Sequence, residues 1–372
     1  MLTALFTESP TATVTAAATT FFVLYLAYVR SVRYNRVKEL EAMPDPLVAG
    51  FRTGHQIMKV VSQLEFPFTA QKSLEFGLFR TYGIPTISKL LCSTKELTHE
   101  VGRRYDDTEL LLREVYENDV DEVERAMRAV RRMNFIHSKY KISNGDYLYT
   151  LSVFVCEPIR WIDRFEWRKL TQRERDGLYV FWREIGIRMG IKNIPPSVDA
   201  FLAFNEEYEA KHMKFAPSNR TVANATIDLF LSLVPLPALR DAGDAVVRSF
   251  MDQRLCKTFG LAPAPEWVHT FIVTLLKVRA FVVRHLFLPR AKLNRRTPER
   301  PIDGKSPARY CPLYTMYEDT YPNGYVIEKL GPKKFENEPT QGVVHERKAD
   351  SIAHDDTEST SDSDDNTATS TM

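Results

Sequence analysis

The feature that most constrains this chain is an uncharged stretch close to its N-terminus. No charged side chain occurs between Glu8 and Arg30, and residues 21–29 are strongly apolar. At about 1.5 Å per helical residue, the stretch reaches roughly 30 Å, which is one hydrocarbon thickness. The sequence therefore predicts a transmembrane anchor helix at residues 10–29, of adequate rather than high hydrophobicity because its first half is rich in Thr and Ala.

The charges that flank this stretch predict its orientation. Arg30, Arg33 and Arg36 follow it at once, whereas the other flank carries Glu8. By the positive-inside rule, the body of the chain stays cytosolic and residues 1–9 form a short lumenal N-terminus. A cleaved signal peptide would carry its basic residues before the apolar run, so it is the weaker alternative, and a buried or peripheral helix also stays open.

The charge of the chain is unevenly distributed. The 372 residues carry a formal net charge of +2, but residues 349–372 hold seven acidic residues and no basic one, which leaves +9 on the rest. A basic body suits an anionic neighbour, either nucleic acid or a membrane face. Because no zinc-finger or RNA-binding motif accompanies the basic runs, we expect a membrane and no nucleic acid.

The hydrophobic pattern predicts an all-α protein. Residues 51–290 show helical periodicity throughout, with no internal repeat and no run of strand-type alternation, so they are expected to form one large helical domain. A basic linker at residues 30–50 precedes it. Residues 291–337 are rich in Pro and Tyr and are predicted to be an irregular extension that packs on the body, and residues 338–372 a disordered acidic tail.

Local signals mark several helix starts and one ambiguous helix. The capping-box spacing, in which two side chains satisfy each other's backbone N–H groups, occurs at Ser93 and Glu96, at Asp119 and Glu122, and at Thr171 and Glu174. Residues 267–288 are long and apolar but carry several charges, so a core helix or one on the membrane surface is expected rather than a spanning helix.

Two sets of residues are candidates for chemistry. On a helical period, His137 shares a face with Val130 and Met133, so its imidazole is expected to point inward. A neutral imidazole there suits haem iron, although a core histidine with one hydrogen-bond partner is the commoner case. Arg104 and Thr108 stack on one helix face and would suit a propionate or an oxygen species, against the ordinary alternative of a solvated arginine.

A third set competes with these. Glu96 and His99, and likewise Glu209 and His212, have the Glu-x-x-His spacing that holds di-iron sites between facing helices. Such a match arises often by chance. Phosphate-binding glycine loops, G-x-S-x-G and H-E-x-x-H are absent from the sequence, which disfavours nucleotide enzymes, α/β-hydrolases and zinc proteases.

Longer runs resemble a known family, the MpaB-type, ER-bound fungal oxygenases. They include R-T-Y-G-I-P-T-I at 80–87, R-Y-D-D-T at 104–108, F-I-H at 135–137, D-Y-L-Y-T-L-S at 146–152 and I-P-P-S at 194–197. The resemblance covers roughly residues 50–290. More distantly, this region is similar to the latex clearing proteins, the bacterial rubber oxygenases.

The resemblance implies a globin-like bundle that binds haem b and uses O₂ to cleave a carbon–carbon double bond. It places His137 as the metal ligand and Arg104 and Thr108 as catalytic residues near the iron. Lys141 takes the cofactor-binding position of the arginine in the H-x-x-x-R pattern, which keeps the charge but loses the bidentate fork. Asp107 stands where the rubber oxygenases have a lysine.

The resemblance thus favours an endoplasmic-reticulum oxygenase with a cytosolic body and a hydrophobic, prenyl or terpenoid-like substrate. It also implies a place in fungal secondary metabolism. A hydrophobic substrate agrees with the predicted anchor, since such a substrate would partition into the adjacent bilayer. Two alternatives stay open: a non-haem di-iron oxygenase, and a non-catalytic, membrane-tethered interaction protein whose acidic tail recruits partners.

Overall fold

The computed structural model describes residues 10–118, 123–304, 306–340 and 342–345, and every regular element in these ranges is helical. The predicted all-α class is therefore confirmed. The main helices are α1 (Pro10–Arg33), α2 (Asn35–Ala42), α3 (Pro46–Ala49), α4 (Phe51–Lys59), α5 (Pro67–Thr81), α6 (Pro85–Thr94), α7 (Glu96–His99), α8 (Val101–Tyr116), α9 (Val123–Ser138), α10 (Asn144–Phe165), α11 (Gln172–Arg188), α12 (Val198–His212), α13 (Pro217–Leu231), α14 (Arg240–Ser249), α15 (Gln253–Phe259) and α16 (Glu266–Leu286). Short helical turns are η1 (Val60–Glu65), η3 (Pro237–Leu239), η4 (Ile327–Lys329) and η5 (Lys333–Phe335).

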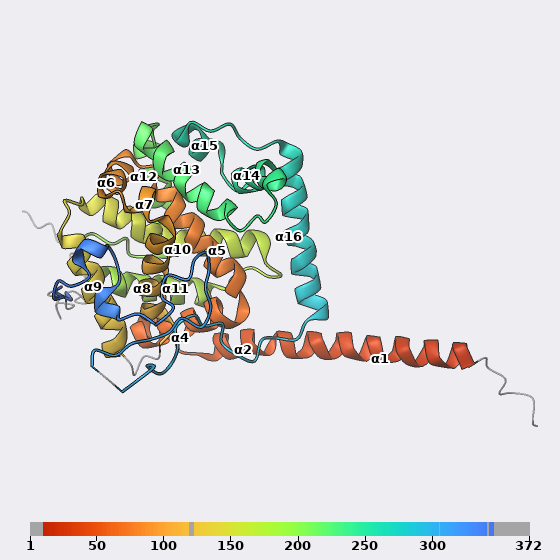
Figure 1. Ribbon diagram of the computed structural model, residues 1–372. Helices are drawn as coiled ribbons and strands as arrows, with labels where there is room; N and C mark the ends of the chain where they lie inside the picture. The colour runs from red at the N-terminus through yellow and green to blue at the C-terminus, as the bar shows by residue number, and fades with distance from the viewer. Residues whose placement is uncertain (1–9, 119–122, 305, 341, 346–372) are drawn as a thin grey trace, which may run out of the picture.

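The body is built around α10, which packs against α5, α11 and α12 (Figure 1). Most of its side chains are buried, because both apolar faces of this long helix meet neighbouring helices. One core cluster joins α4, α8, α9, α10 and α11, and a second joins α5, α13 and α15. The predicted likeness to globins stays a prediction.

Helix starts follow the sequence signals in part. The capping box of Thr171 and Glu174 is present at the start of α11 and confirms that prediction. The predicted box of Ser93 and Glu96 is wrong, because α6 continues through Ser93, whose hydroxyl donates to the carbonyl of Leu90 instead. Lys95, at a positive φ of 61°, then separates α6 from α7. The third predicted box, at residues 119–122, lies outside the described residues.

The apolar N-terminal stretch forms α1, which projects away from the body (Figure 1). It is long and apolar enough to cross a membrane, and its side chains are almost all exposed in the chain by itself. The C-terminal end of α1 is fastened to the end of α16. The hydroxyl of Tyr25 donates to the Leu286 carbonyl at 2.7 Å, and Arg33 donates to the Phe287 carbonyl.

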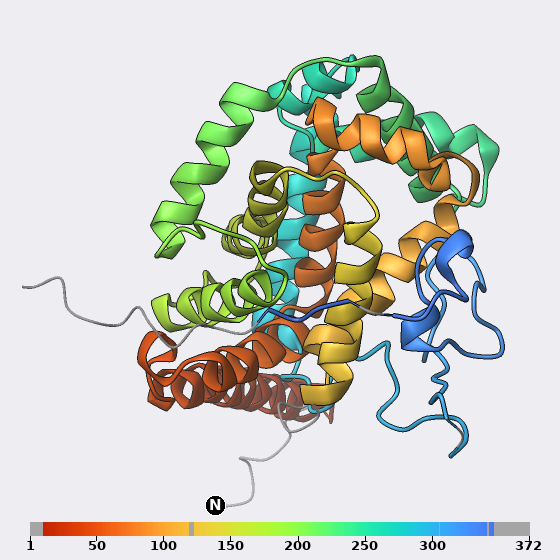
Figure 2. The same cartoon turned by 90° about the vertical axis from the view of Figure 1, so that its left-hand side faces the viewer.

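The irregular segment after α16 lies against α8 and α9, as the blue trace in Figure 2 shows. Its backbone N–H groups at Arg296 and Thr297 donate to the buried carboxylate of Glu117, at 3.1 and 2.8 Å. Tyr325 donates to Glu114, and its backbone pairs with Tyr310. Buried carboxylates are costly without such partners, so these contacts fix the segment on the bundle.

The first residues of the predicted acidic tail contact the body. Glu338 pairs with Lys139 at 2.8 Å, and the backbone N–H of His345 donates to the Arg188 carbonyl at 3.1 Å. Residues 346–372 and the predicted lumenal residues 1–9 lie outside the described part of the chain.

Candidate functional site

A cavity of about 560 Å³ lies inside the body, within the range of small-molecule sites. Its walls come from α5 through α11, from α13, and from Gly331 and Pro332 of the C-terminal segment. The lining is mainly apolar, with Leu74, Leu111 and Phe154 among its side chains. Such a surface favours a hydrophobic ligand of substantial size.

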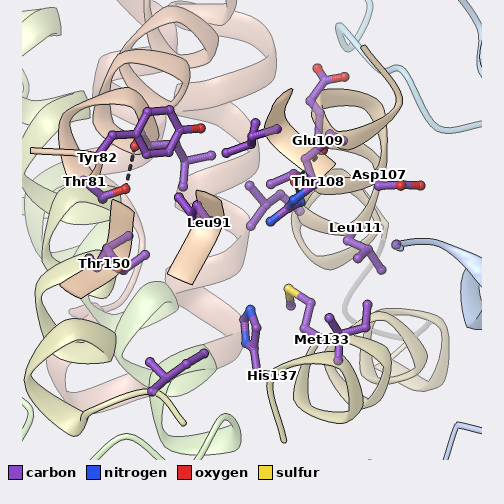
Figure 3. A pocket seen from close by; sticks show the side chains of 18 of the residues that line it. Thr81, Tyr82, Leu91, Asp107, Thr108, Glu109, Leu111, Met133, His137 and Thr150 are labelled. Atoms are coloured by element: carbon purple, nitrogen blue, oxygen red, sulfur yellow. Dashed lines mark hydrogen bonds between the residues drawn. The ribbon is translucent and has the colours of Figure 1, made fainter. Parts of the chain in front are cut away.

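His137 stands in the wall of this cavity, near the end of α9, and Figure 3 shows its imidazole pointing into the space. Its Nδ1 atom is enclosed and has no hydrogen-bond partner in the described chain. Burial, with a further contribution from the positive charge of Arg104, lowers the pKa of His137 to about 4. The imidazole is therefore neutral near pH 7, so one of its two ring nitrogens carries no proton.

The helical period explains why His137 faces inward. Met133 and Val130 lie one and two turns before it on α9, and both are buried. The Tyr147 ring, at the start of α10, meets the imidazole edge-on with 5.6 Å between ring centres. This contact restrains the orientation of the ring.

Arg104 and Thr108 both lie on α8 and line the same cavity. The guanidinium of Arg104 donates to the Thr108 hydroxyl, which in turn donates to the Arg104 carbonyl at 2.8 Å. The structure thus brings His137, Arg104 and Thr108 to one cavity, where Arg104 supplies a positive charge. Their roles in binding and catalysis stay predictions.

Tyr82 also lines the cavity, on the side opposite α8 in Figure 3. Burial raises the pKa of Tyr82, against a weaker opposing effect of Arg104, so its hydroxyl keeps its proton at neutral pH. Reasoning from spacing alone missed this residue. The R-T-Y-G-I-P-T-I run could have indicated it. Gly83 and Pro85 follow Tyr82 closely, and α5 ends directly before Tyr82, beside the cavity.

Two further lining groups were also missed. Trp182, on α11, is 1% exposed, and its Nε1 donor has no hydrogen-bond partner in the residues that the structure describes. The hydroxyl of Tyr140 is enclosed and likewise lacks a partner there. Buried donors of this kind are rare in proteins unless a ligand or water meets them.

Lys141 and Asp107 line the cavity in different ways. Lys141 is exposed. Because α9 ends at Ser138, Lys141 lies beyond the helix and does not share a helix face with His137. Asp107 is buried and extends toward the C-terminal segment (Figure 3), where Tyr321 donates to its carboxylate. Burial raises the pKa of Asp107, and the hydrogen bond from Tyr321 opposes the rise.

The two Glu-x-x-His motifs do not form a common site. The carboxylate of Glu209 is buried and binds Arg80 through two hydrogen bonds of 2.6 Å, and it also accepts from Tyr149. His212 stacks on Tyr208 with 4.2 Å between ring centres. Within the described residues, no group of three or more His, Cys, Asp or Glu side chains is arranged to hold a metal ion.

Comparison with known proteins gives a consistent result. Residues 93–283 match the family model described as ER-bound oxygenase mpaB/B'/Rubber oxygenase, catalytic domain. The chain is 31% identical to the ER-bound oxygenase mpaB' of Penicillium brevicompactum, over 85% of this chain and 87% of the relative. It is 33% identical to ER-bound oxygenase mpaB of the same organism, over 73% and 68% of the two chains, and 35% identical to the mpaB of Penicillium roqueforti, over 63% and 86%. The chain therefore belongs to the ER-bound oxygenase mpaB and rubber oxygenase family, a family of oxidoreductases.

Proposed function

We propose that this protein is a haem-dependent oxygenase that cleaves a carbon–carbon double bond in a hydrophobic, prenyl or terpenoid-like substrate. The observation that carries the proposal is His137, a neutral imidazole with an unpartnered nitrogen, set in the wall of a large apolar cavity. Cleavage of one alkene by one O₂ into two carbonyl groups balances without a reductant. A setting in secondary metabolism is part of the same proposal.

The residues of the cavity fit a haem group. His137 would hold the iron, since an imidazole must be unprotonated to bind a metal and burial keeps His137 in that state. A porphyrin also requires apolar walls, and the lining supplies them. The exposed Lys141, at the edge of the cavity, is a cation suited to a propionate. When bound, haem b would supply a redox-active iron that can activate O₂.

The remaining residues have roles that follow from their chemistry. Arg104 places a positive charge in an apolar space, where it would stabilise negative charge that develops on oxygen. The hydroxyl of Thr108, held by Arg104, offers a further polar contact. Tyr82 keeps its proton and can donate a hydrogen bond to a polar group of the substrate. The apolar walls exclude water and orient the chain of the alkene.

The test of this function uses labelled oxygen. The purified full-length protein is incubated with geranylgeraniol as a prenyl probe under ¹⁸O₂, and the products are examined by mass spectrometry. We expect carbonyl products in which both new oxygen atoms carry the label. His137→Ala should abolish them, whereas His212→Ala, outside the cavity, should retain activity. Loss of activity in His212→Ala with retention in His137→Ala would contradict the proposal and favour the di-iron alternative.

We also propose that α1 anchors the protein in the membrane of the endoplasmic reticulum. The relatives are named ER-bound, and α1 has the length and composition of a membrane span. The cluster of Arg30, Arg33 and Arg36 at its C-terminal end supports a single pass with the body in the cytosol. This orientation agrees with the cysteines, since Cys92, Cys156, Cys256 and Cys311 are all unpaired.

A further inference from the structure

The helix α16 carries an apolar face that the described part of the chain leaves exposed. Trp267, Phe271, Leu275, Val278 and Phe281 recur at helical spacing, and their exposed fractions lie between 49% and 71%. Single exposed apolar residues are ordinary on protein surfaces, but a continuous stripe of this kind marks a contact surface.

The orientation of this stripe is fixed by the opposite face of α16. Val268 and Ala280 are buried against the body. The His269 ring binds the Ser249 carbonyl at 2.8 Å, and Arg279 pairs with the buried carboxylate of Glu166 at 2.9 Å. The helix therefore cannot rotate to hide its apolar side chains without breaking these contacts.

The position of α16 relative to α1 indicates what covers the stripe. In Figures 1 and 2, α16 runs crosswise to α1, on the side of the body from which α1 projects. The C-terminal parts of the two helices meet, where Tyr25 binds the carbonyl of Leu286, the last residue of α16, and Arg33 binds that of Phe287. A bilayer crossed by α1 would therefore lie parallel to α16.

The charges at this junction suit lipid headgroups. Exposed Arg30 ends the apolar part of α1, and exposed Arg284 and Arg290 lie at the end of α16. Arg36, on α2 just after α1, donates to the carbonyl of Arg290, just after α16, at 2.8 Å. An apolar stripe bordered by cations is the pattern of helices that lie in the interface of an anionic membrane.

We propose that α16 is a second membrane-contact element, which lies flat in the cytosolic interface of the bilayer that α1 crosses, with its apolar stripe among the lipid chains. This proposal rests on the proposed insertion of α1. One crossing helix and one flat helix together would restrain the tilt of the body relative to the bilayer more than the crossing helix by itself.

The test measures contact between Trp267 and lipid in the full-length protein. The chain is reconstituted into phosphatidylcholine and phosphatidylserine vesicles, with and without lipid brominated close to the headgroup. The emission of Trp267 is taken as the difference between the natural chain and Trp267→Phe. We expect brominated lipid to reduce this difference emission at least twofold. As a control, Leu313→Trp in the Trp267→Phe chain places a tryptophan at another exposed position, on the C-terminal segment, and it should stay unquenched.

A second set of variants tests whether the other residues of the stripe carry the contact with lipid. Phe271→Glu with Val278→Glu should diminish the quenching of Trp267, whereas Leu313→Glu should leave it unchanged. Vesicle flotation reports the insertion of α1 separately. A chain that floats with vesicles while its Trp267 stays unquenched would overturn the role of α16 and leave the anchor intact, including the case in which a second copy of the chain covers the stripe. A chain that does not float would overturn both.

Discussion

Arg296, in the C-terminal segment, and Asp106, on α8, form a buried ion pair with 2.5 Å between Nη2 and Oδ1. Arg296 also binds Glu109 on the same helix. Because α8 carries Arg104 and Thr108, a segment far along the chain holds in place the helix that lines one wall of the cavity. The segment lies beyond the matched catalytic-domain range of residues 93–283, yet its Gly331 and Pro332 line the cavity itself.

Replacement of Arg296 by methionine should destabilise the fold strongly. The change leaves Asp106 buried without its cation, and breaking one partner of a buried pair costs about 3–5 kcal/mol. Thermal unfolding in detergent measures the effect. Arg309→Met is the matched control, because Arg309 pairs with Asp303 at a partly exposed site, where a pair contributes about 0–1 kcal/mol. Equal losses in the two variants would contradict the structural role of the segment.

Stability should depend on pH through His137. Its folded pKa of about 4 lies below the usual value of 6.5, so between these values the unfolded chain binds a proton that the folded chain does not. Stability is therefore lost as the pH falls through this window, by at most about 3 kcal/mol. The melting temperature of the haem-free chain, followed from pH 7 to pH 4, should fall less steeply in His137→Gln. The control His212→Gln should keep the natural slope, and identical slopes in all three chains would count against a buried neutral imidazole.

Gly331 is the position at which the C-terminal segment closes the cavity. Its φ of +105° disfavours any residue with a side chain, and an added Cβ would lie 2.5 Å from the Cδ1 atom of Ile136. Gly331→Ala should therefore destabilise the protein by about 1–3 kcal/mol. At Gly304 an added Cβ meets no atom within 4 Å, so Gly304→Ala should be nearly neutral. If both substitutions left the melting temperature unchanged, Gly331 would not be packed against α9.

The sequence predicted the parts of the site that depend on local pattern. The inward direction of His137 follows from helical periodicity with Val130 and Met133, and the start of α11 follows from the Thr171 and Glu174 cap. The same cap spacing failed at Ser93, because α6 continues through that residue and Lys95 then adopts a left-handed backbone. Helical spacing by itself does not reveal where a helix ends.

The long-range contacts had no such local signal. The hydrogen bonds that fix Arg296 and Thr297 to Glu117 join residues about 180 positions apart, and no periodicity or motif encodes them. Lys141 shows that residue spacing can also predict a contact wrongly. Its position four residues after His137 suggests a shared helix face, but α9 ends at Ser138 and places it at the edge of the cavity.

The orientation of the anchor makes a separate prediction. Protease added to intact microsomes should digest the body, because the proposed orientation, with the basic cluster that includes Arg30 on the cytosolic flank, would place the body in the cytosol. An epitope fused before α1 should be protected until detergent opens the vesicles, which serves as the control. Full protection of the body in sealed microsomes would contradict a cytosolic site.

The absorbance spectrum of the purified full-length protein, with porphyrin and iron analysis, tests most directly whether His137 holds haem iron in the cavity. We expect a Soret band and about one haem per chain, which His137→Ala removes or shifts and His212→Ala preserves. A colourless protein that contains no porphyrin but turns over substrate would contradict it.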